Sequence, residues 1–164
     1  MTQSAGILAF RRLGADTPVQ VLLVHPGGPL WTRKDDAAWS LPKGEYGRDD
    51  DPLETARREF CEEIGSQCPD GEFLPLGHTT LKSGKRVTAW AIEADLDVSS
   101  IHSNLFTMEW PPRSGRMATF PEVDRAQWFA PEEARRKIHP GQAAFLDRLD
   151  DLLAPAPTQP AAVD

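Results

Sequence analysis

Cysteine and long apolar runs are both scarce in this chain of 164 residues. The only cysteines are Cys61 and Cys68, so a disulfide framework is not indicated and a reducing, cytoplasmic setting is expected. No apolar run approaches the roughly 18 residues that cross a bilayer. Met1–Phe10 lacks the basic start and cleavage site of a secretory signal. We therefore expect no contact with membranes and no secretion.

Positive charge is also in deficit, because 18 Lys and Arg residues face 25 Asp and Glu residues, giving a net charge of −7. That balance argues against stable nucleic-acid binding. It is compatible with a small phosphorylated substrate, provided that bound cations and a few local Lys or Arg residues offset the repulsion.

Hydrophobic residues make up 40% of the chain, which is sufficient for the core of a single domain. We assign that domain to residues 1–153. The Pro- and Ala-rich segment 154–164 is expected to be a disordered tail.

Strand-like and helix-like segments are mixed along the domain. Strands are expected at residues 6–11, 19–25, 39–41, 73–81, 86–96, 105–110 and 127–129, with a loop at 111–115. Helices are expected from Pro52 to about Ile64, from Pro131, and from Pro140 to Leu153. Asp51 followed by Pro52 is a strong helix start, and Gly65 is a typical stop. This mixture predicts an α/β layered fold.

The first expected helix concentrates negative charge next to its apolar stripe. Glu59, Glu62 and Glu63 are three and four residues apart, so they share one helical turn. Their mutual repulsion costs only a few tenths of a kcal/mol per exposed pair, so the three residues could simply form an acidic face in contact with solvent. The alternative is a site for a divalent cation such as Mg²⁺, which prefers oxygen ligands.

The segment around this helix favours the cation site. Gly44, Asp50, Arg58-Glu59, Glu62-Glu63 and Gly65 stand at fixed spacings in GEYGRDDDPLETARREFCEEIG, and Leu41-Pro-Lys-Gly44 leads into it. This pattern resembles the Nudix box, a loop–helix–loop motif of about 22 residues whose helix carries metal ligands. The resemblance implies an α/β/α sandwich with a mixed β-sheet. Asp50 stands where Glu is usual and Ser66 where an aliphatic residue is usual, so a role for Asp50 is in doubt.

The resemblance also implies roles for individual residues. Glu59, Glu62, Glu63 and the Gly44 carbonyl would bind Mg²⁺, for which Mn²⁺ could substitute, and Arg58 would orient Glu59. Glu59 is our first choice as general base. Glu122, before a late strand containing Trp128, stands where family members often have another acidic ligand or base.

Substrate contacts are expected from basic and acidic residues in three loops. Lys43 adjoins a metal ligand, Arg33 and Lys34 precede the box, and the segment EWPPRSGR contributes Glu109, Arg113 and Arg116. Arg forms forked contacts with phosphate, and Lys acts as a point charge. For the residues outside the box, solvent exposure or a rigid structural loop is the alternative.

The resemblance implies a hydrolase in which water attacks one phosphorus of a diphosphate in a nucleoside triphosphate or another nucleoside diphosphate derivative. Hydrolysis of dinucleoside or diphosphoinositol polyphosphates is an alternative, since the Leu41–Gly44 lead-in is frequent there. Yet Lys82, Ser83 and Gly84 stand where family subtypes carry Pro or Tyr markers. A nucleotide-binding regulator without catalysis, and a homodimer, also remain open.

Overall fold

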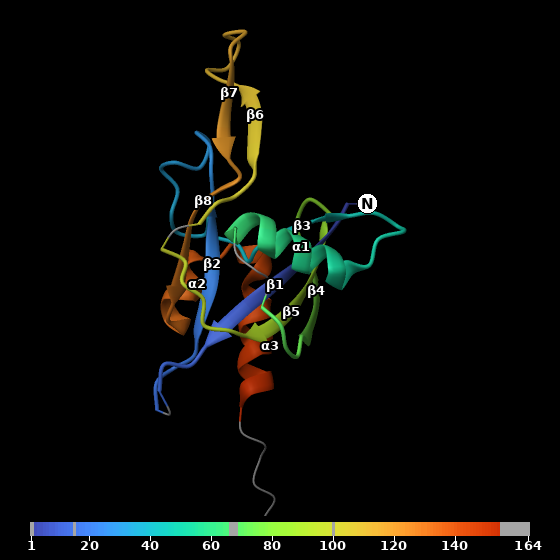
Figure 1. Cartoon of the computed structure of the whole chain (residues 1–164), viewed down its shortest axis with the longest axis vertical. Helices are drawn as coiled ribbons and strands as arrows, with labels where there is room; N and C mark the ends of the chain where they lie inside the picture. The colour runs from blue at the N-terminus through green and yellow to red at the C-terminus, as the bar shows by residue number, and fades with distance from the viewer. Residues whose placement is uncertain (1, 15, 66–68, 100, 155–164) are drawn as a thin grey trace, which may run out of the picture.

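A central β-sheet lies between helices in the computed structural model, which describes residues 2–14, 16–65, 69–99 and 101–154. Six strands form the sheet, in the order β4-β5-β1-β2-β8, with β3 paired to β1. Helix α1 covers one face of the sheet, and α3 runs along the other (Figure 1). The expected α/β/α sandwich with a mixed sheet is therefore confirmed.

The sheet strands are β1 (Gln3–Arg11), β2 (Gln20–Pro26), β3 (Lys43–Tyr46), β4 (Leu74–Thr80), β5 (Arg86–Glu93) and β8 (Val123–Phe129). The expected hairpin of β1 and β2 is present, as is the antiparallel pair of β4 and β5. Strand β1 also pairs in parallel with β5 along most of its length. This pairing brings the start of β5 beside the start of β1.

Strand β3 is responsible for the position of the box. It pairs with the first half of β1, from Gln3 to Gly6, whereas β2 pairs with the end of β1 at Phe10 and Arg11. Lys43 and Gly44 are thereby fixed at the edge of the sheet. The chain then passes through a loop into α1 (Pro52–Ile64).

Helix α1 forms as its sequence predicts. The Asp51 side chain accepts hydrogen bonds from the backbone N–H groups of Leu53 and Glu54 at 2.9 and 3.2 Å. Gly65 ends the helix with φ of +73°, the left-handed conformation that glycine adopts readily. Ala56, Phe60 and Ile64 are buried against β1. Burial of a side chain such as Phe60 contributes about 1.5–3 kcal/mol, which fixes the face that the glutamates occupy.

The second core, on the opposite face, is built around Trp39 and the two C-terminal helices. Helix α2 spans Pro131–Lys137, and α3 spans Ala143–Leu153 after a 3-10 turn at Pro140–Gln142. Phe145, Leu146 and Leu149 of α3 are buried in this cluster. The expected single helix from Pro140 is thus divided into two helical segments.

Other element boundaries needed correction. Residues 39–41 make only isolated bridges, Val24 with Ser40 and Trp39 with Ile138, and the strand begins later at Lys43. Strand β8 begins at Val123 rather than at residue 127, since it pairs with β2 along its length, and β5 ends at Glu93. No described helix is long and apolar enough to cross a membrane. The expected tail, apart from Ala154, lies outside the described residues.

A separate hairpin projects from the domain (Figure 1). Strand β6 (Leu105–Glu109) was expected, but its partner β7 (Met117–Pro121) was not. The two strands form their own sheet, in register from Leu105 with Pro121 to Glu109 with Met117. Its base leads directly into Glu122 and β8.

Candidate functional site

Four carboxylates, those of Glu45, Glu59, Glu63 and Glu122, line one open pocket of about 380 Å³. Glu59 and Glu63 come from α1, and Glu122 comes from the junction of β7 and β8. Lys43 and Gly44 of β3 line the same pocket. The fold therefore brings Gly44, Glu59 and Glu63 of the box together with Lys43 and Glu122.

Gly44 and Glu59 approach each other very closely. A Cβ atom on residue 44 would lie 2.1 Å from Cδ and 2.5 Å from Oε1 of Glu59. Only a glycine allows the carboxylate to lie directly against this stretch of backbone. This contact gives a physical reason for the first glycine of the pattern.

Glu63 is held in a position that disfavours its negative charge. Its Oε2 accepts a hydrogen bond of 3.2 Å from the backbone N–H of Lys43. Burial raises the pKa of Glu63 to about 8, and the nearby charges of Glu59 and Glu122 add to the effect, while Lys43 opposes it. A carboxylate with these neighbours gains stability when a cation binds beside it.

Glu59 is more exposed, with 18% of its side chain accessible. Burial raises its pKa, as do the charges of Glu62 and Glu122, and Arg58 lowers it. Arg58 Nη2 lies 3.6 Å from Glu59 Oε1, and Arg58 Nε lies 3.9 Å from Glu62 Oε1. Arg58 therefore lies where a residue that orients Glu59 would be expected. Glu62 neighbours Glu59 but does not line the pocket.

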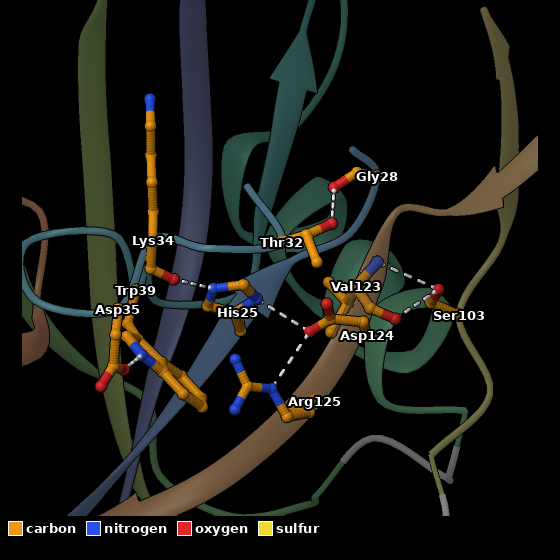
Figure 2. A network of polar contacts seen from close by, with 10 residues as sticks. All are labelled: His25, Gly28, Thr32, Lys34, Asp35, Trp39, Ser103, Val123, Asp124 and Arg125. Carbon is orange, nitrogen blue, oxygen red and sulfur yellow. Dashed lines mark hydrogen bonds and ion pairs between the residues drawn. The ribbon is translucent and has the colours of Figure 1, made fainter. Parts of the chain in front are cut away.

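Backbone hydrogen bonds hold Glu122 at the pocket. Its carbonyl accepts from Gly27 N–H at 2.9 Å, and its own N–H donates to Asn104 at 2.9 Å. The next residue, Val123, exchanges two bonds with the Ser103 hydroxyl, which accepts from its N–H at 3.1 Å and donates to its carbonyl at 3.0 Å (Figure 2). Two segments, at Gly27 and at Ser103-Asn104, thus fix the backbone on which Glu122 stands.

His25 ties the start of β8 to the loop that follows β2 (Figure 2). The ring is fully buried, with Nδ1 at 2.8 Å from Asp124 Oδ1 and Nε2 at 2.6 Å from the Lys34 carbonyl. A carbonyl only accepts hydrogen bonds, so Nε2 donates to Lys34, while Nδ1 faces the Asp124 carboxylate. The spacing of the histidines in the sequence gave no sign of this network.

The donor set fits a divalent cation that prefers oxygen. Carboxylates, a backbone carbonyl at Gly44 and adjacent waters are the ligands such ions usually take. Within the described ranges, no three His, Cys, Asp or Glu side chains are already grouped as a complete metal site. Burial, and after it the charges of neighbouring carboxylates, raises the pKa of Glu59 and Glu63, and a bound cation would offset both effects.

Sequence reasoning missed three polar residues of this pocket, Ser4, Glu45 and Lys85. Lys85 Nζ lies 3.2 Å from Glu45 Oε1, and its charge, together with burial as the larger cause, lowers the pKa of Lys43. Ser4 Oγ is buried and has no hydrogen-bond partner among the described residues. The positions of Ser4 and Lys85 depend on the parallel pairing of β1 with β5, for which the local pattern held no signal.

The remaining candidates for substrate contact do not line this pocket. Arg33 and Lys34 are exposed in the loop after β2, where Lys34 Nζ lies 4.8 Å from the centre of the Trp31 ring. Glu109, Arg113 and Arg116 are exposed on the projecting hairpin (Figure 1). The structure therefore brings Lys43, but not these five residues, into the carboxylate pocket.

A larger cavity of about 650 Å³ lies elsewhere, between Arg11, Asp95 and Trp128. The Arg11 guanidinium lies 4.5 Å from the Trp128 ring centre and 2.9 Å from Asp95. Arg11 pairs with Asp95 and lies against Trp128, and no carboxylate of α1 lines this cavity. Size alone therefore does not identify the chemical site.

Comparison with known proteins places the whole domain in one family. The family model described as the NUDIX domain matches residues 2–149. A search of curated protein sequences gives no significant match.

Solved structures agree with this assignment at the level of fold. An Ap4A hydrolase of C. elegans in a binary complex has a TM-score of 0.62 and 20% identity, covering 92% of this chain and 97% of that one. The NUDIX domain of Shewanella oneidensis NrtR, complexed with ADP ribose, has a TM-score of 0.62 and 14% identity, covering 93% and 88%. A MutT protein from Methanosarcina mazei has a TM-score of 0.58 and 18% identity, covering 92% and 94%. At these identities the likeness concerns the fold alone.

Proposed function

The chain belongs to the NUDIX family and is a hydrolase of phosphorus-containing anhydrides, and we propose that it cleaves the diphosphate linkage of a small nucleotide with Mg²⁺ as cofactor. One observation carries the proposal. Glu59, Glu63 and Glu122 share a pocket with Lys43, while Gly44 lies directly against Glu59. Carboxylates for a cation and an ammonium group for phosphate thus stand side by side.

Glu59, Glu62, Glu63 and the Gly44 carbonyl would hold the cation, with Glu122 as a further acidic group. When bound, Mg²⁺ or Mn²⁺ supplies positive charge that polarises phosphate oxygens and lowers the pKa of water. Arg58 lies within ion-pair distance of both Glu59 and Glu62, so it restrains the two carboxylates.

The chain's own residues would conduct the proton transfer. A water oxygen forms a bond to one phosphorus as the bridging P–O bond breaks, and the second phosphate leaves with that electron pair. Glu59 accepts the proton of the attacking water. Lys43 places a positive charge beside the phosphates, where burial disfavours any unpaired charge.

Residues outside the pocket would contact more distant parts of the substrate. Arg33 and Lys34 lie on one loop, and Glu109, Arg113 and Arg116 lie on the hairpin. A hairpin contributed by a second copy of the chain is one way for these groups to approach the pocket, so a homodimer belongs to the proposal. Hydrolysis of dinucleoside polyphosphates is the second candidate, because the C. elegans relative described as an Ap4A hydrolase shares the fold.

Replacement of Glu63 by Gln tests the site. The variant keeps the shape of the side chain but removes its charge, so Mg²⁺-dependent phosphate release should fall by about 10²-fold or more. Coupling to a phosphatase measures turnover across a set of nucleotides with Mg²⁺ and Mn²⁺. Glu54→Gln is the matched control, since Glu54 stands exposed on the same helix. Equal turnover in Glu63→Gln and Glu54→Gln would show that the metal site lies elsewhere.

Product analysis distinguishes the two substrate classes. A nucleoside triphosphate cleaved between its α and β phosphorus atoms gives a monophosphate and pyrophosphate. A dinucleoside polyphosphate instead gives two nucleotides and no pyrophosphate. Tight nucleotide binding without turnover with either cation would indicate a regulator and contradict the proposed activity.

A further inference from the structure

The backbone hydrogen bonds of the projecting hairpin show which edge of each strand is occupied. At one end Trp110 N–H donates to the Arg116 carbonyl, and at the other Glu122 N–H donates to the Asn104 carbonyl, both at 2.9 Å. In an antiparallel pair, residues that bond the partner strand alternate with residues whose N–H and C=O groups point away from it. Even-numbered residues of β6 therefore bond β7, and odd-numbered residues present their backbone groups outward.

The outer edge of β6 is free. Its outward residues are Leu105, Thr107 and Glu109, all of them exposed, and β6 pairs with no described strand other than β7. Proline, lysine and a β-bulge are common protections of an exposed edge, and β6 has none of them. A hairpin of two strands is only marginally stable by itself, so a further strand at this edge would stabilise it.

The outer edge of β7 is closed at the base of the hairpin. Pro121 has no N–H group to donate there. A Cβ atom on Gly27 would lie 2.0 Å from the Pro121 carbonyl oxygen, so the loop after β2 lies directly against this end of β7. The hairpin therefore offers β6, rather than β7, to an additional strand.

A second copy of β6 fits this edge in antiparallel register about a twofold axis at Thr107. Thr107 then faces its own copy and Glu109 faces Leu105, so no like charges are opposed. Each outward N–H meets an outward carbonyl, as an antiparallel ladder requires. Leu105 is 65% exposed, the highest value among the described large hydrophobic residues, and the pairing would cover part of it.

The same register carries the tip of each hairpin to the base of the other. Trp110 would stand opposite Asn104 of the second copy, whose carbonyl accepts the N–H of Glu122, so two strand spacings of about 4.8 Å separate Trp110 from that Glu122. Arg113 and Arg116 follow at the tip, exposed and without ion-pair partners among the described residues. A tip with two positive charges thereby approaches a pocket that four carboxylates line.

From this complementarity we propose that β6 pairs with β6 of a second copy, and that the hairpin tip of each copy supplies Arg113 and Arg116 to the carboxylate pocket of the other. The pairing itself is independent of the proposed function. The role of the two arginines rests on that function, because they would contact the outer phosphates of the substrate. The edge is only five residues long, so the dimer should dissociate in the micromolar range.

Proline substitutions test the edge. Thr107→Pro removes the central N–H of the proposed pairing, and Thr119→Pro is the matched control, because Thr119 faces Thr107 across the hairpin and its N–H points out from the opposite edge. Sedimentation velocity should show a dimer whose Kd rises about ten-fold or more in Thr107→Pro and is nearly unchanged in Thr119→Pro. A monomeric wild type, or a Kd in Thr107→Pro no higher than in Thr119→Pro, overturns the proposal.

Cysteine at the same two positions gives a test that does not depend on how a proline variant folds. At the twofold axis, Thr107→Cys would place two Cα atoms about 5.5 Å apart, within the range of about 4.4–6.8 Å that a disulfide spans. Thr119→Cys would lie three strand spacings of about 4.8 Å from its own copy. Mild oxidation should therefore link Thr107→Cys, but not Thr119→Cys, into a covalent dimer on non-reducing electrophoresis. Equal linking in both variants, or in neither, overturns the proposed pairing.

Mixed dimers test the role of the tip. Glu63→Gln disables the pocket, and a double variant with Arg113→Ala and Arg116→Ala disables the tip, so each should be nearly inactive alone. In a mixed dimer an intact pocket meets an intact tip. Random pairing of the two variants above the dimer Kd should therefore restore about a quarter of wild-type turnover, since half of the dimers are mixed and each has one complete site.

The mixing experiment separates this inference from the proposed function. Hydrolysis by the wild type without any restoration in the mixture upholds the activity and overturns the exchange of tips, because the arginines would then act within their own chain. A wild type that hydrolyses no nucleotide overturns both the proposed function and the role of the arginines. The pairing of the two β6 strands is then decided by sedimentation and by the disulfide, neither of which requires turnover.

Discussion

At Gly44 the backbone lies directly against the carboxylate of Glu59, the group that we propose as the general base. A methyl group there would meet the flexible end of Glu59 rather than rigid backbone, with contacts of 2.1 to 2.5 Å. Glu59 can move aside by changing rotamer, so the fold should survive the change. The carboxylate would then stand away from its productive position.

We therefore expect Gly44→Ala to reduce turnover by about 10²-fold, the typical effect of a misplacement near 1 Å. Steady-state kinetics and a thermal melt should show low kcat with a nearly unchanged Tm. Gly47→Ala is the control from the same loop, since a Cβ atom there would meet only Asp50 Oδ2 at 3.4 Å. Wild-type kcat in Gly44→Ala would mean that the contact with Glu59 has no bearing on the reaction.

Residue-level features divide clearly into those that the sequence could predict and those that it could not. The box glutamates and Gly44 were predictable because they depend on the 3.6-residue period of one helix and the loop before it. Glu122 required only the family pattern. Ser4 and Lys85 were not predictable, because they join the pocket through strand pairing between residues more than 80 positions apart.

Among the elements, the junction of β2 and β8 supports Glu122, the acidic pocket residue that is most distant in sequence from α1. His25 on β2 contacts Asp124 on β8, two residues after Glu122. The same ring binds the carbonyl of Lys34 and packs edge-on against Trp39, with ring centres 5.2 Å apart. One buried side chain thus connects the loop after β2, the core and the start of β8.

Replacing His25 by Phe should destabilise this junction. The ring would still pack against Trp39, but the Lys34 carbonyl would lose its donor at a buried position, which costs about 1–3 kcal/mol. Urea unfolding should show a lower midpoint with an unchanged slope. Thr32→Val removes an exposed bond of 3.0 Å to the Gly28 carbonyl in the same loop and should cost less than about 1 kcal/mol. Equal midpoints in the two variants would contradict a structural role for the network.

The predicted element boundaries were wrong where tertiary contacts, rather than the local sequence pattern, determine the structure. Trp39 was expected in a strand, but its burial against Phe129 and its bond from Nε1 to Asp35 at 2.8 Å do not require one. The β7 segment was not recognised because Met117 and Thr119 are exposed and the segment pairs only with β6. By contrast, α1 carries its own start and stop signals, so both of its ends were predicted correctly.

At the scale of the whole molecule, negative charge dominates, and the proposed site also carries an excess of it. The net charge of −7 accompanies a pocket that four carboxylates and two lysines line. Glu63 lies among them with a pKa raised to about 8 from an ordinary value of 4.5. The metal-free protein therefore retains a proton on Glu63 that the unfolded chain releases at much lower pH.

This difference predicts how stability changes with pH when divalent cations are removed. Between about pH 4.5 and 8 the folded state binds the Glu63 proton more tightly than the unfolded state, so this group's contribution to stability is full below pH 4.5 and declines as pH rises towards 8. Thermal melts in EDTA should show that decline in the wild type and a flatter profile in Glu63→Gln, which does not titrate there. Adding Mg²⁺ at pH 8 should raise the Tm of the wild type more than that of the variant, because a cation that binds the folded state more tightly stabilises it more. Parallel profiles in EDTA together with equal Mg²⁺ effects would show that Glu63 neither titrates in this range nor contributes to a cation site.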